Sequence, residues 1–456
     1  MTVRELARLA GGTVEGRGEA EVLSAEIDSR RLEPGDLFVA LPGARRDGHE
    51  FVGAALAVAA AALVRTDAEL APPPAGRALV RVPDPLKAFQ ALAAHERLAR
   101  RWRVAAVTGS VGKTTTKSLL ASLLAPHVAT GSTSGSRNSQ QGLPAEVLSQ
   151  PPEVDVFVAE AGMSHPGELT VLGEILRPQV LLYTRIAPVH AEFFPDFEGI
   201  VRAKGELLPW LDPEGTLVVN ADDPHQRDYP RQTRARTVAY GAGADARLED
   251  VVDLGLFGSR FRLVLPDGEA AVELAIAGLH QAENLLAAAT AASAFGVTAE
   301  QVAATAGELR ADPHRGRVLQ LASGVSVVDD SYNASPVAVR RLLALLGRAP
   351  GRRVAVLGEM YELGELAATA HEEIGSEAAA ACEVLVAVGG AEAARLAAAA
   401  RTAGMPGAGV FLAADAEAAA DLLRRLLRPG DVVLVKGSRG VGLDRTVAAL
   451  AGEEAA

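Results

Sequence analysis

Lysine is nearly missing from this chain. Its basic residues number 45, and only five of them are lysines: Lys87, Lys113, Lys117, Lys204 and Lys436. Arginine therefore serves as the general surface cation. A lysine that remains points to a position that needs a compact ammonium, or an amine able to lose its proton. Asparagine is equally scarce, with four residues: Asn138, Asn220, Asn284 and Asn333.

Other absences exclude whole classes of protein. The single cysteine, Cys382, rules out an internal disulfide and fits a reducing compartment. The net charge of −12 argues against nucleic acid or an anionic membrane as the main partner. The longest apolar run, 51–64, is shorter than the roughly 20 residues of a membrane span. The amino terminus lacks the apolar core of a signal peptide. We expect a soluble cytoplasmic protein.

The pattern of apolar runs divides the chain into three segments. A length of 456 residues suits three domains at about 150 residues each. Residues 1–82 alternate short strands with helical stretches, the strands being Asp36–Leu41, Leu63–Arg65 and Ala78–Val82. Residues 83–311 carry apolar runs of strand length spaced by helices, which favours a parallel sheet buried on both faces. These runs are Val104–Val107, Val154–Ala159, Val180–Tyr183 and Leu217–Val219.

A β-rich insert is expected near 237–276, before helices at 280–295 and 299–309. From 312 to 456 the strand–helix alternation predicts a second doubly wound α/β unit. Its strands are expected at Val325–Val328, Val354–Leu357, Val384–Val388, Val410–Leu412 and Val432–Val435. The fold class is therefore α/β throughout.

A phosphate-binding loop follows the first strand of the second segment. The residues expected to contact a nucleotide are Gly109, Ser110, Val111, Gly112, Lys113, Thr114 and Thr115. A strand, a glycine-bearing turn and a helix place backbone N–H groups around a polyphosphate. Lys113 then supplies a charge, and Thr114 a hydroxyl for Mg²⁺. Val107 stands where the usual pattern has its first glycine. The alternative is a glycine-containing helix start.

Glu160 ends the apolar strand of 154–159, where a carboxylate that positions Mg²⁺ belongs at the edge of a parallel sheet. The alternative is a solvated strand end. No asparagine precedes a lysine, which excludes the base-reading motif of regulatory GTPases.

The motifs together resemble those of the Mur ligases of bacterial cell-wall synthesis. The resemblance is carried by 108–117, 160–168, 203–206, 220–223, 278–284, 329–336 and 356–365. It implies a uridine-nucleotide domain, an ATPase domain and a Rossmann-like domain. The third-segment motifs are most similar to the family member that joins D-alanyl-D-alanine to UDP-N-acetylmuramoyl-tripeptide. We therefore expect these two substrates, no nucleic acid, no membrane span and a monomer.

The resemblance also implies site residues. ATP and two Mg²⁺ ions are expected, with Thr114, Glu160, His190 and N6-carboxylated Lys204 as metal ligands. These would act with Lys113 in catalysis. Arginine cannot form the carbamate because it stays protonated, which accounts for a lysine at 204. Further nucleotide contacts are implied for Asn284, at the adenine ring, and for Asp330, Tyr332 and Arg317, with Arg315 as a competing arginine. Substrate contacts are implied for Ser29, Arg30, Asp47, Gly48, His49, Arg137, Asn138 and Asn333.

The implied reaction passes a phosphoryl group from ATP to a carboxylate, and an amine then displaces phosphate from the acyl phosphate. Three alternatives stay open. One is a sibling ligase, although the Asp-Asn-Pro-Arg run of the enzymes adding diaminopimelate or lysine is missing here. The second is a folyl-polyglutamate ligase, which would begin close to the phosphate loop. The third is a non-catalytic ATP switch. The third residue of the tripeptide cannot be inferred from the sequence.

Overall fold

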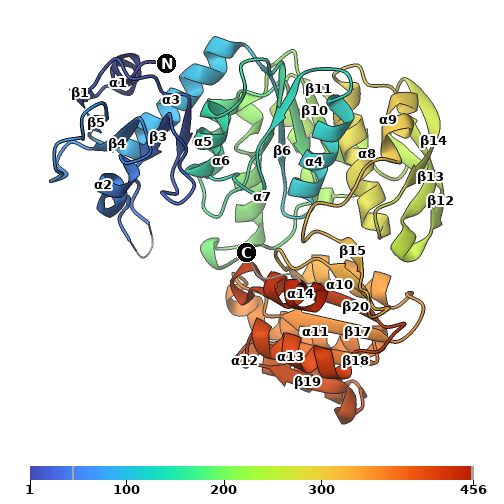
Figure 1. Cartoon of the computed structure of the whole chain (residues 1–456). Helices are drawn as coiled ribbons and strands as arrows, with labels where there is room; N and C mark the ends of the chain where they lie inside the picture. The colour runs from blue at the N-terminus through green and yellow to red at the C-terminus, as the bar shows by residue number, and fades with distance from the viewer. Residues whose placement is uncertain (44–45, 190, 453–456) are drawn as a thin grey trace.

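The computed structural model describes residues 1–43, 46–189 and 191–452. Three α/β units are visible in Figure 1: an N-terminal unit (blue), a middle unit (cyan to yellow) and a C-terminal unit (orange to red) that lies beneath the middle one. The predicted α/β class is confirmed. Each of the four sheets lies within one predicted segment, while the boundaries at 82/83 and 311/312 stay a prediction. In these described ranges no helix has the length and apolar character needed to cross a membrane.

The N-terminal unit is built on a five-stranded sheet of order β1-β5-β4-β3-β2. Its strands are β1 (Thr13–Gly16), β2 (Ser24–Glu26), β3 (Asp36–Val39), β4 (Ala61–Arg65) and β5 (Ala78–Val82). Only β1 runs antiparallel to its neighbour. The sequence predicted β3 to β5 and missed β1, which has no buried residue, and β2, which has only three residues. Helix α1 (Val3–Ala10) packs on one face and α2 (Val52–Ala55) on the other.

Helix α3 (Pro85–Arg100) joins the N-terminal unit to the middle unit. Asp84 caps its first turn and Pro85 occupies its first position, which explains where it starts. Ala88, Phe89 and Leu92 are buried in the N-terminal core, whereas Ala93 belongs to a core of the middle unit. The two units are therefore fixed to each other by apolar packing along one helix.

The middle unit has a fully parallel six-stranded sheet of order β11-β10-β9-β6-β8-β7. Its strands are β6 (Arg103–Thr108), β7 (Thr130–Ser132), β8 (Val156–Glu160), β9 (Val180–Tyr183), β10 (Thr216–Asn220) and β11 (Arg236–Tyr240). Helices α4 (Lys113–Leu124) and α8 (Leu279–Ser293) cover one face. The other face carries α6 (Glu168–Leu176) and α7 (Phe197–Gly205).

The expected β-rich insert is smaller than predicted. Its first stretch is β11, which pairs in parallel with β10 as an edge of the main sheet. The antiparallel part is a three-stranded sheet of β12 (Arg247–Asp253), β13 (Ser259–Leu265) and β14 (Gly268–Leu274). This sheet packs against α8 and α9 (Ala299–Ala306). An alternating apolar pattern alone does not distinguish an edge strand of one sheet from the start of another.

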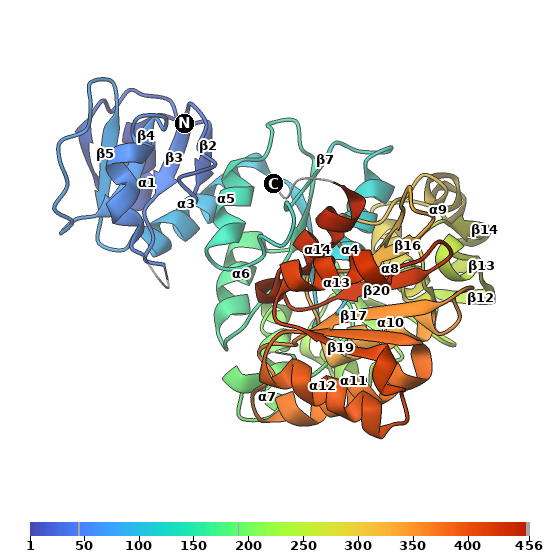
Figure 2. The ribbon, with the colours of Figure 1, turned by 60° about the horizontal axis from the view of Figure 1, so that its bottom comes forward.

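The C-terminal unit is a six-stranded sheet of order β15-β16-β20-β17-β18-β19, parallel except for β15. Its strands are β15 (Arg317–Gln320), β16 (Ser326–Asp329), β17 (Arg353–Gly358), β18 (Val384–Val388), β19 (Val410–Ala413) and β20 (Val432–Lys436). Helices α10 (Pro336–Leu346), α11 (Ala367–Ala381) and α12 (Ala391–Thr402) cover one face. Figure 2 shows them opposite α13 (Ala416–Leu426) and α14 (Leu443–Ala451).

Candidate nucleotide site

One cavity of about 510 Å³ lies between the middle and C-terminal units. The middle unit supplies the phosphate loop, Glu160 and the start of α8, and the C-terminal unit supplies the loops that follow β16, β17 and β20. Two ion pairs are among the contacts that join these units. Arg341 of α10 donates to Glu283 of α8 across 2.8 Å, and Arg348 pairs with Asp253 of β12 at 2.7 Å.

The phosphate loop has the expected geometry at its glycines. Gly109 and Gly112 adopt φ values of +139° and +88°, which side chains with a Cβ rarely tolerate. Gly112 is the N-cap of α4, so the helix begins at Lys113 as predicted. Val107 is buried within β6, so the loop needs no glycine at that position. Two of the predicted loop amides are already used, because Ser110 and Val111 both donate to the carbonyl of Arg185. The amides at the start of α4 remain the suitable donors for phosphate.

Glu160 lies at the end of β8 and is 1% exposed. Its carboxylate accepts hydrogen bonds from the hydroxyl of Thr114 at 2.7 Å and from the amide of Asn138 at 2.5 Å. The predicted alternative, a solvated strand end, is therefore wrong. A hydroxyl and a carboxylate in contact fit a magnesium site, since the ion takes oxygen ligands and keeps substrate or water oxygens in its remaining positions.

The two lysines predicted for catalysis differ in exposure, since Lys113 is half-buried and Lys204 is fully buried. Burial lowers the pKa of Lys113, the charge of Arg315 lowers it further, and Glu160 acts in the opposite direction. Lys204 on α7 is 1% exposed, and its pKa is lowered well below the ordinary value, first by burial and then by the charge of Lys113. Such a shift favours the neutral amine, which is the form that reacts with CO₂.

The metal-ligand set predicted from the resemblance is only partly visible. His190 lies outside the described residues. Within 1–43, 46–189 and 191–452, no three His, Cys, Asp or Glu side chains cluster as a metal-binding group. The oxygen donors brought together are those of Thr114 and Glu160. Lys204 would add oxygens only as its carbamate.

Residues from the loop after β16 reach the cavity from the C-terminal unit. Asp330 pairs with the ammonium of Lys436, which also donates to the carbonyl of Asn333 at 2.8 Å. Tyr332 hydrogen-bonds through its hydroxyl to Ser136 of the middle unit. Ser335 and Pro336 begin α10 as predicted, although the Ser335 side chain makes no capping hydrogen bond. Lys436 therefore has a place that the sequence alone did not reveal: it fixes the loop of 330–333.

The structure brings Arg315, rather than Arg317, to the cavity. Arg315 lies over the ring of Tyr332, with its Cζ 4.1 Å from the ring centroid, and lines the cavity. Arg317 is exposed at the start of β15 and is not among the lining residues. The ATP contact predicted for Arg317 stays a prediction, and Arg315, the competing arginine, is the one that lines the cavity. The two neighbours are equally charged, and the sequence could not tell which one faces inward.

Helix α8 contributes His280, Gln281 and Asn284 to the lining. The Asn284 amide donates to Gln281 at 3.0 Å and lies against Gly112, where an added Cβ would approach its Oδ1 to 2.7 Å. Tyr361 and Arg439 also line the cavity and were not predicted. They lie on loops of the C-terminal unit, and Tyr361 belongs to the 356–365 motif of the resemblance, although neither residue was given a role.

The predicted substrate residues of the N-terminal unit do not line this cavity. Arg30, Asp47 and His49 have local partners, and Ser29 is half-buried. Arg30 is largely exposed and forms a two-point ion pair with Asp28, whose pKa is lowered to about 2 mainly by that hydrogen bond. Asp47 caps the short helix that begins at Gly48 and contacts the Nδ1 of His49 at 2.6 Å. Substrate contact by these residues stays a prediction.

Fold and cavity define a nucleotide-binding α/β protein whose phosphate loop is closed by a separate C-terminal unit. Three family models match successive parts of the chain. They are the Mur ligase family, catalytic domain at 22–97, the Mur ligase middle domain at 107–292 and the Mur ligase, glutamate ligase domain at 314–439. The chain belongs to the Mur ligase family, whose members are ATP-dependent enzymes that form carbon–nitrogen bonds.

Individual relatives match over almost their whole length. A Mycobacterium tuberculosis UDP-N-acetylmuramoyl-tripeptide–D-alanyl-D-alanine ligase is 35% identical, covering 100% of this chain and 98% of the relative. The crystal structure of MurF from Acinetobacter baumannii superposes with a TM-score of 0.87 at 29% identity, covering 99% of both chains. MurF ligase from Thermotoga maritima in complex with ADP gives a TM-score of 0.80 at 29% identity, over 95% and 98% of the two chains.

Proposed function

We propose that this Mur ligase joins D-alanyl-D-alanine to UDP-N-acetylmuramoyl-tripeptide, as the names of its relatives describe for those proteins. The observation that carries the proposal is the meeting of two motifs at one cavity. The Thr114–Glu160 contact lies on one side, and the loop of 330–333, anchored by Lys436, lies on the other. ATP hydrolysis alone does not require this second wall.

The chemistry follows from positioning and charge. The terminal carboxylate of the tripeptide attacks the γ-phosphorus of ATP, and ADP leaves with the bridging oxygen. The amine of D-alanyl-D-alanine then attacks the acyl carbon, phosphate leaves, and the amine loses its proton. Lys113 and Arg315 both line the cavity, where they would supply positive charge to the transferring group. Enclosure between the two units limits hydrolysis of the acyl phosphate by water.

Mg²⁺ would be held by Thr114 and Glu160, with a second ion at His190 and carboxylated Lys204. Bound there, the ions neutralise charge on the phosphate oxygens. The carbamate forms when the neutral amine of Lys204 attacks CO₂ and releases a proton. We assign Asn284 to the adenine and Asn138, Asp330, Tyr332 and Asn333 to the walls of the same site. The N-terminal residues Ser29, Arg30, Asp47, Gly48 and His49 are assigned to the uridine nucleotide, and the cytoplasm is the expected compartment.

A substrate-omission assay tests this function. Phosphate release is measured with ATP and Mg²⁺ alone, with each substrate added singly, and with both. We expect sustained release only with both substrates, together with a pentapeptide product in mass spectrometry. Sustained release with UDP-N-acetylmuramoyl-L-alanyl-D-glutamate and diaminopimelate or lysine, in place of the two expected substrates, identifies a sibling ligase. Release that ignores both substrates identifies an ATP switch. Either of these two results contradicts the proposal.

A further inference from the structure

The loop of 133–141, between β7 and α5 (Gly142–Leu148), is held from all three units of the molecule. Within the middle unit, Lys117 donates to the carbonyl of Thr133 at 2.5 Å, and the amide of Ser134 donates to Glu146 at 2.7 Å. From the C-terminal unit, the hydroxyl of Tyr332 meets Ser136. The third attachment comes from the N-terminal unit through Arg137.

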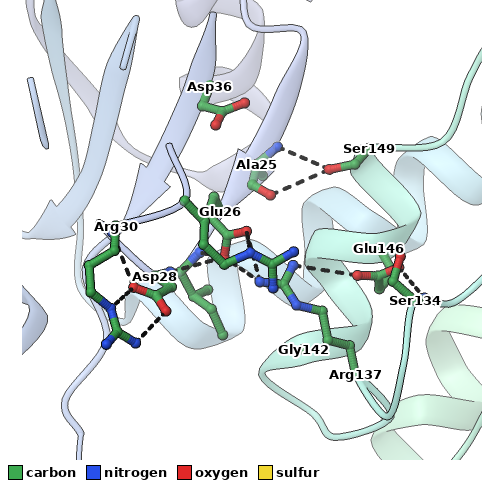
Figure 3. A network of polar contacts seen from close by, with 12 residues as sticks. Ala25, Glu26, Asp28, Arg30, Asp36, Ser134, Arg137, Gly142, Glu146 and Ser149 are labelled. Carbon is green, nitrogen blue, oxygen red and sulfur yellow. Dashed lines mark hydrogen bonds and ion pairs between the residues drawn. The ribbon is translucent and has the colours of Figure 1, made fainter. Parts of the chain in front are cut away.

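Figure 3 shows the guanidinium of Arg137 between the carboxylates of Glu26 and Glu146. Glu26 ends β2 of the N-terminal sheet and accepts two hydrogen bonds from Arg137, at 2.6 and 2.7 Å. Glu146 on α5 is 3.4 Å away. The side chains of Glu26, Arg137 and Glu146 are 9%, 20% and 6% exposed, so solvent screens these charges only weakly.

Asn138, the residue after Arg137, lines the cavity. Asn138 donates to the carboxylate of Glu160, and its own carbonyl accepts from the amide of Gly162 at 2.9 Å. Gly162 leaves the room for this side chain, because an added Cβ would lie 2.7 Å from the Asn138 amide. Arg137 and Asn138 point to different units from adjacent positions, so the conformation of the loop sets both contacts at once.

We propose that Arg137 is a positioning residue that fixes the loop of 133–141 to the N-terminal sheet, so that Asn138 orients the Glu160 carboxylate. Arg137 was predicted to contact substrate, but two glutamates occupy its guanidinium here. The ion pair is not needed to dock the N-terminal unit. Helix α3 does this by apolar packing, and Ala145 of α5 is buried in the same core. Loss of the pair therefore loosens the loop on its N-terminal side while the units stay together.

The test compares Arg137→Met, Arg137→Lys, Glu26→Gln and the double variant in the full-length enzyme. Arg31→Met is the matched control, because Arg31 also faces Glu26, at 3.8 Å, but is more exposed and lies outside the loop. We expect Arg137→Met and Glu26→Gln each to lower kcat about tenfold, since small displacements at a reacting centre cost this much or more. The KM for UDP-N-acetylmuramoyl-tripeptide should stay within about twofold, because no substrate contact is removed. The kcat of the double variant should be no lower than that of the worse single variant, because both changes remove the same ion pair. Arg137→Lys should have a higher kcat than Arg137→Met. The control, Arg31→Met, should match the unmodified enzyme.

Hydrogen–deuterium exchange provides a readout that does not depend on activity. Peptides covering 133–141 should exchange faster in Arg137→Met and Glu26→Gln, while peptides of α3 and β2 stay protected. The activity readout rests on the proposed function, whereas the exchange readout does not, so failure of one is distinguishable from failure of the other. Unchanged exchange in the loop would overturn the positioning role. So would a raised KM at constant kcat in Arg137→Met with no effect of Glu26→Gln, since that pattern means direct substrate binding.

Discussion

The hydroxyl of Thr114 lies 2.7 Å from the carboxylate of Glu160, so the first turn of α4 and the end of β8 meet at one point. Both side chains are buried, and the second carboxylate oxygen is taken by Asn138. The orientation of Glu160 is thus fixed before any ligand arrives. A prearranged oxygen pair reduces the reorganisation needed when a cation binds.

Replacing Thr114 tests this arrangement. We expect Thr114→Val to lower kcat at least about tenfold and to raise the Mg²⁺ concentration needed for half-maximal phosphate release, because one of the proposed metal ligands is lost. Thr116→Val is the matched control on the same helix. Thr116 is also buried, and no described residue pairs with its hydroxyl. The control should keep the Mg²⁺ dependence and gain up to about 1 kcal/mol in urea unfolding, since a buried unpaired hydroxyl is removed. Identical Mg²⁺ dependence in both variants would contradict the assignment of Thr114.

Arg315 and Arg317 form a natural pair for comparison. Arg315→Met should raise the KM for ATP and lower kcat, together about a hundredfold in kcat/KM, because the proposed mechanism uses this cavity-lining cation at the transferring phosphate. Arg317→Met should change kcat/KM by less than about twofold, since an exposed surface substitution is usually close to neutral. Steady-state phosphate release at varied ATP measures both. A larger loss of kcat/KM in Arg317→Met than in Arg315→Met would place Arg317 in the site. It would also require a different domain arrangement during turnover.

Much of the fold could be predicted because its signals are local. The buried strands of parallel sheets are continuous apolar runs, so β9 and β18 lie where the sequence predicted them. Short edge strands such as β1, β2, β7 and β15 were missed, since three or four partly exposed residues carry no distinct period. Their pairing comes from the neighbouring strand rather than from their own composition.

The site also has residues that the sequence could predict and residues that it could not. The phosphate loop and Glu160 are predictable because a strand end or helix start fixes their position. The choice between Arg315 and Arg317 depends on which face of the chain turns toward the middle unit. The pairing of Arg137 with Glu26 joins residues 111 positions apart. Contacts of this kind depend on how units are placed, and one sequence does not contain that information in any local pattern.

His280 gives a pH prediction. Its pKa is lowered from 6.5 to about 4, first by burial and then by the charges of Arg341 and Lys436, while Asp330 acts in the opposite direction. As pH falls, the unfolded chain takes up the proton first, so the stability contribution is complete above about pH 6.5 and lost toward pH 4. The loss is about 3 kcal/mol at most. The melting temperature of His280→Gln should fall less between pH 6.5 and pH 4 than that of the unmodified protein, so the acid limb of its stability curve is flatter. His165→Gln, at an exposed position, should leave the limb unchanged. An equal acid limb in all three proteins would contradict the prediction.

Lys204 gives the last prediction, in which Lys204→Met gains stability and loses activity. Burial and Lys113 hold its pKa well below the ordinary 10.5, so the folded protein releases this proton at lower pH than the unfolded chain does. Stability then rises with pH up to about the ordinary value. In CO₂-free buffer with chelator, Lys204→Met should unfold at a higher temperature than the unmodified protein near pH 7, and the gap should close as pH approaches 10.5. Lys204→Arg keeps a buried charge that cannot be lost, so it should be the least stable.

In the phosphate-release assay both Lys204 variants should be inactive, because neither side chain can form a carbamate. Labelled bicarbonate should give a carbamate carbon signal in the unmodified enzyme with Mg²⁺ and none in Lys204→Arg. The other four lysines serve as the internal control, since they are present in both proteins. A Lys204→Arg enzyme with full activity would show that the position needs only a cation. The scarcity of lysine would then have another cause, since arginine already supplies cations throughout this chain.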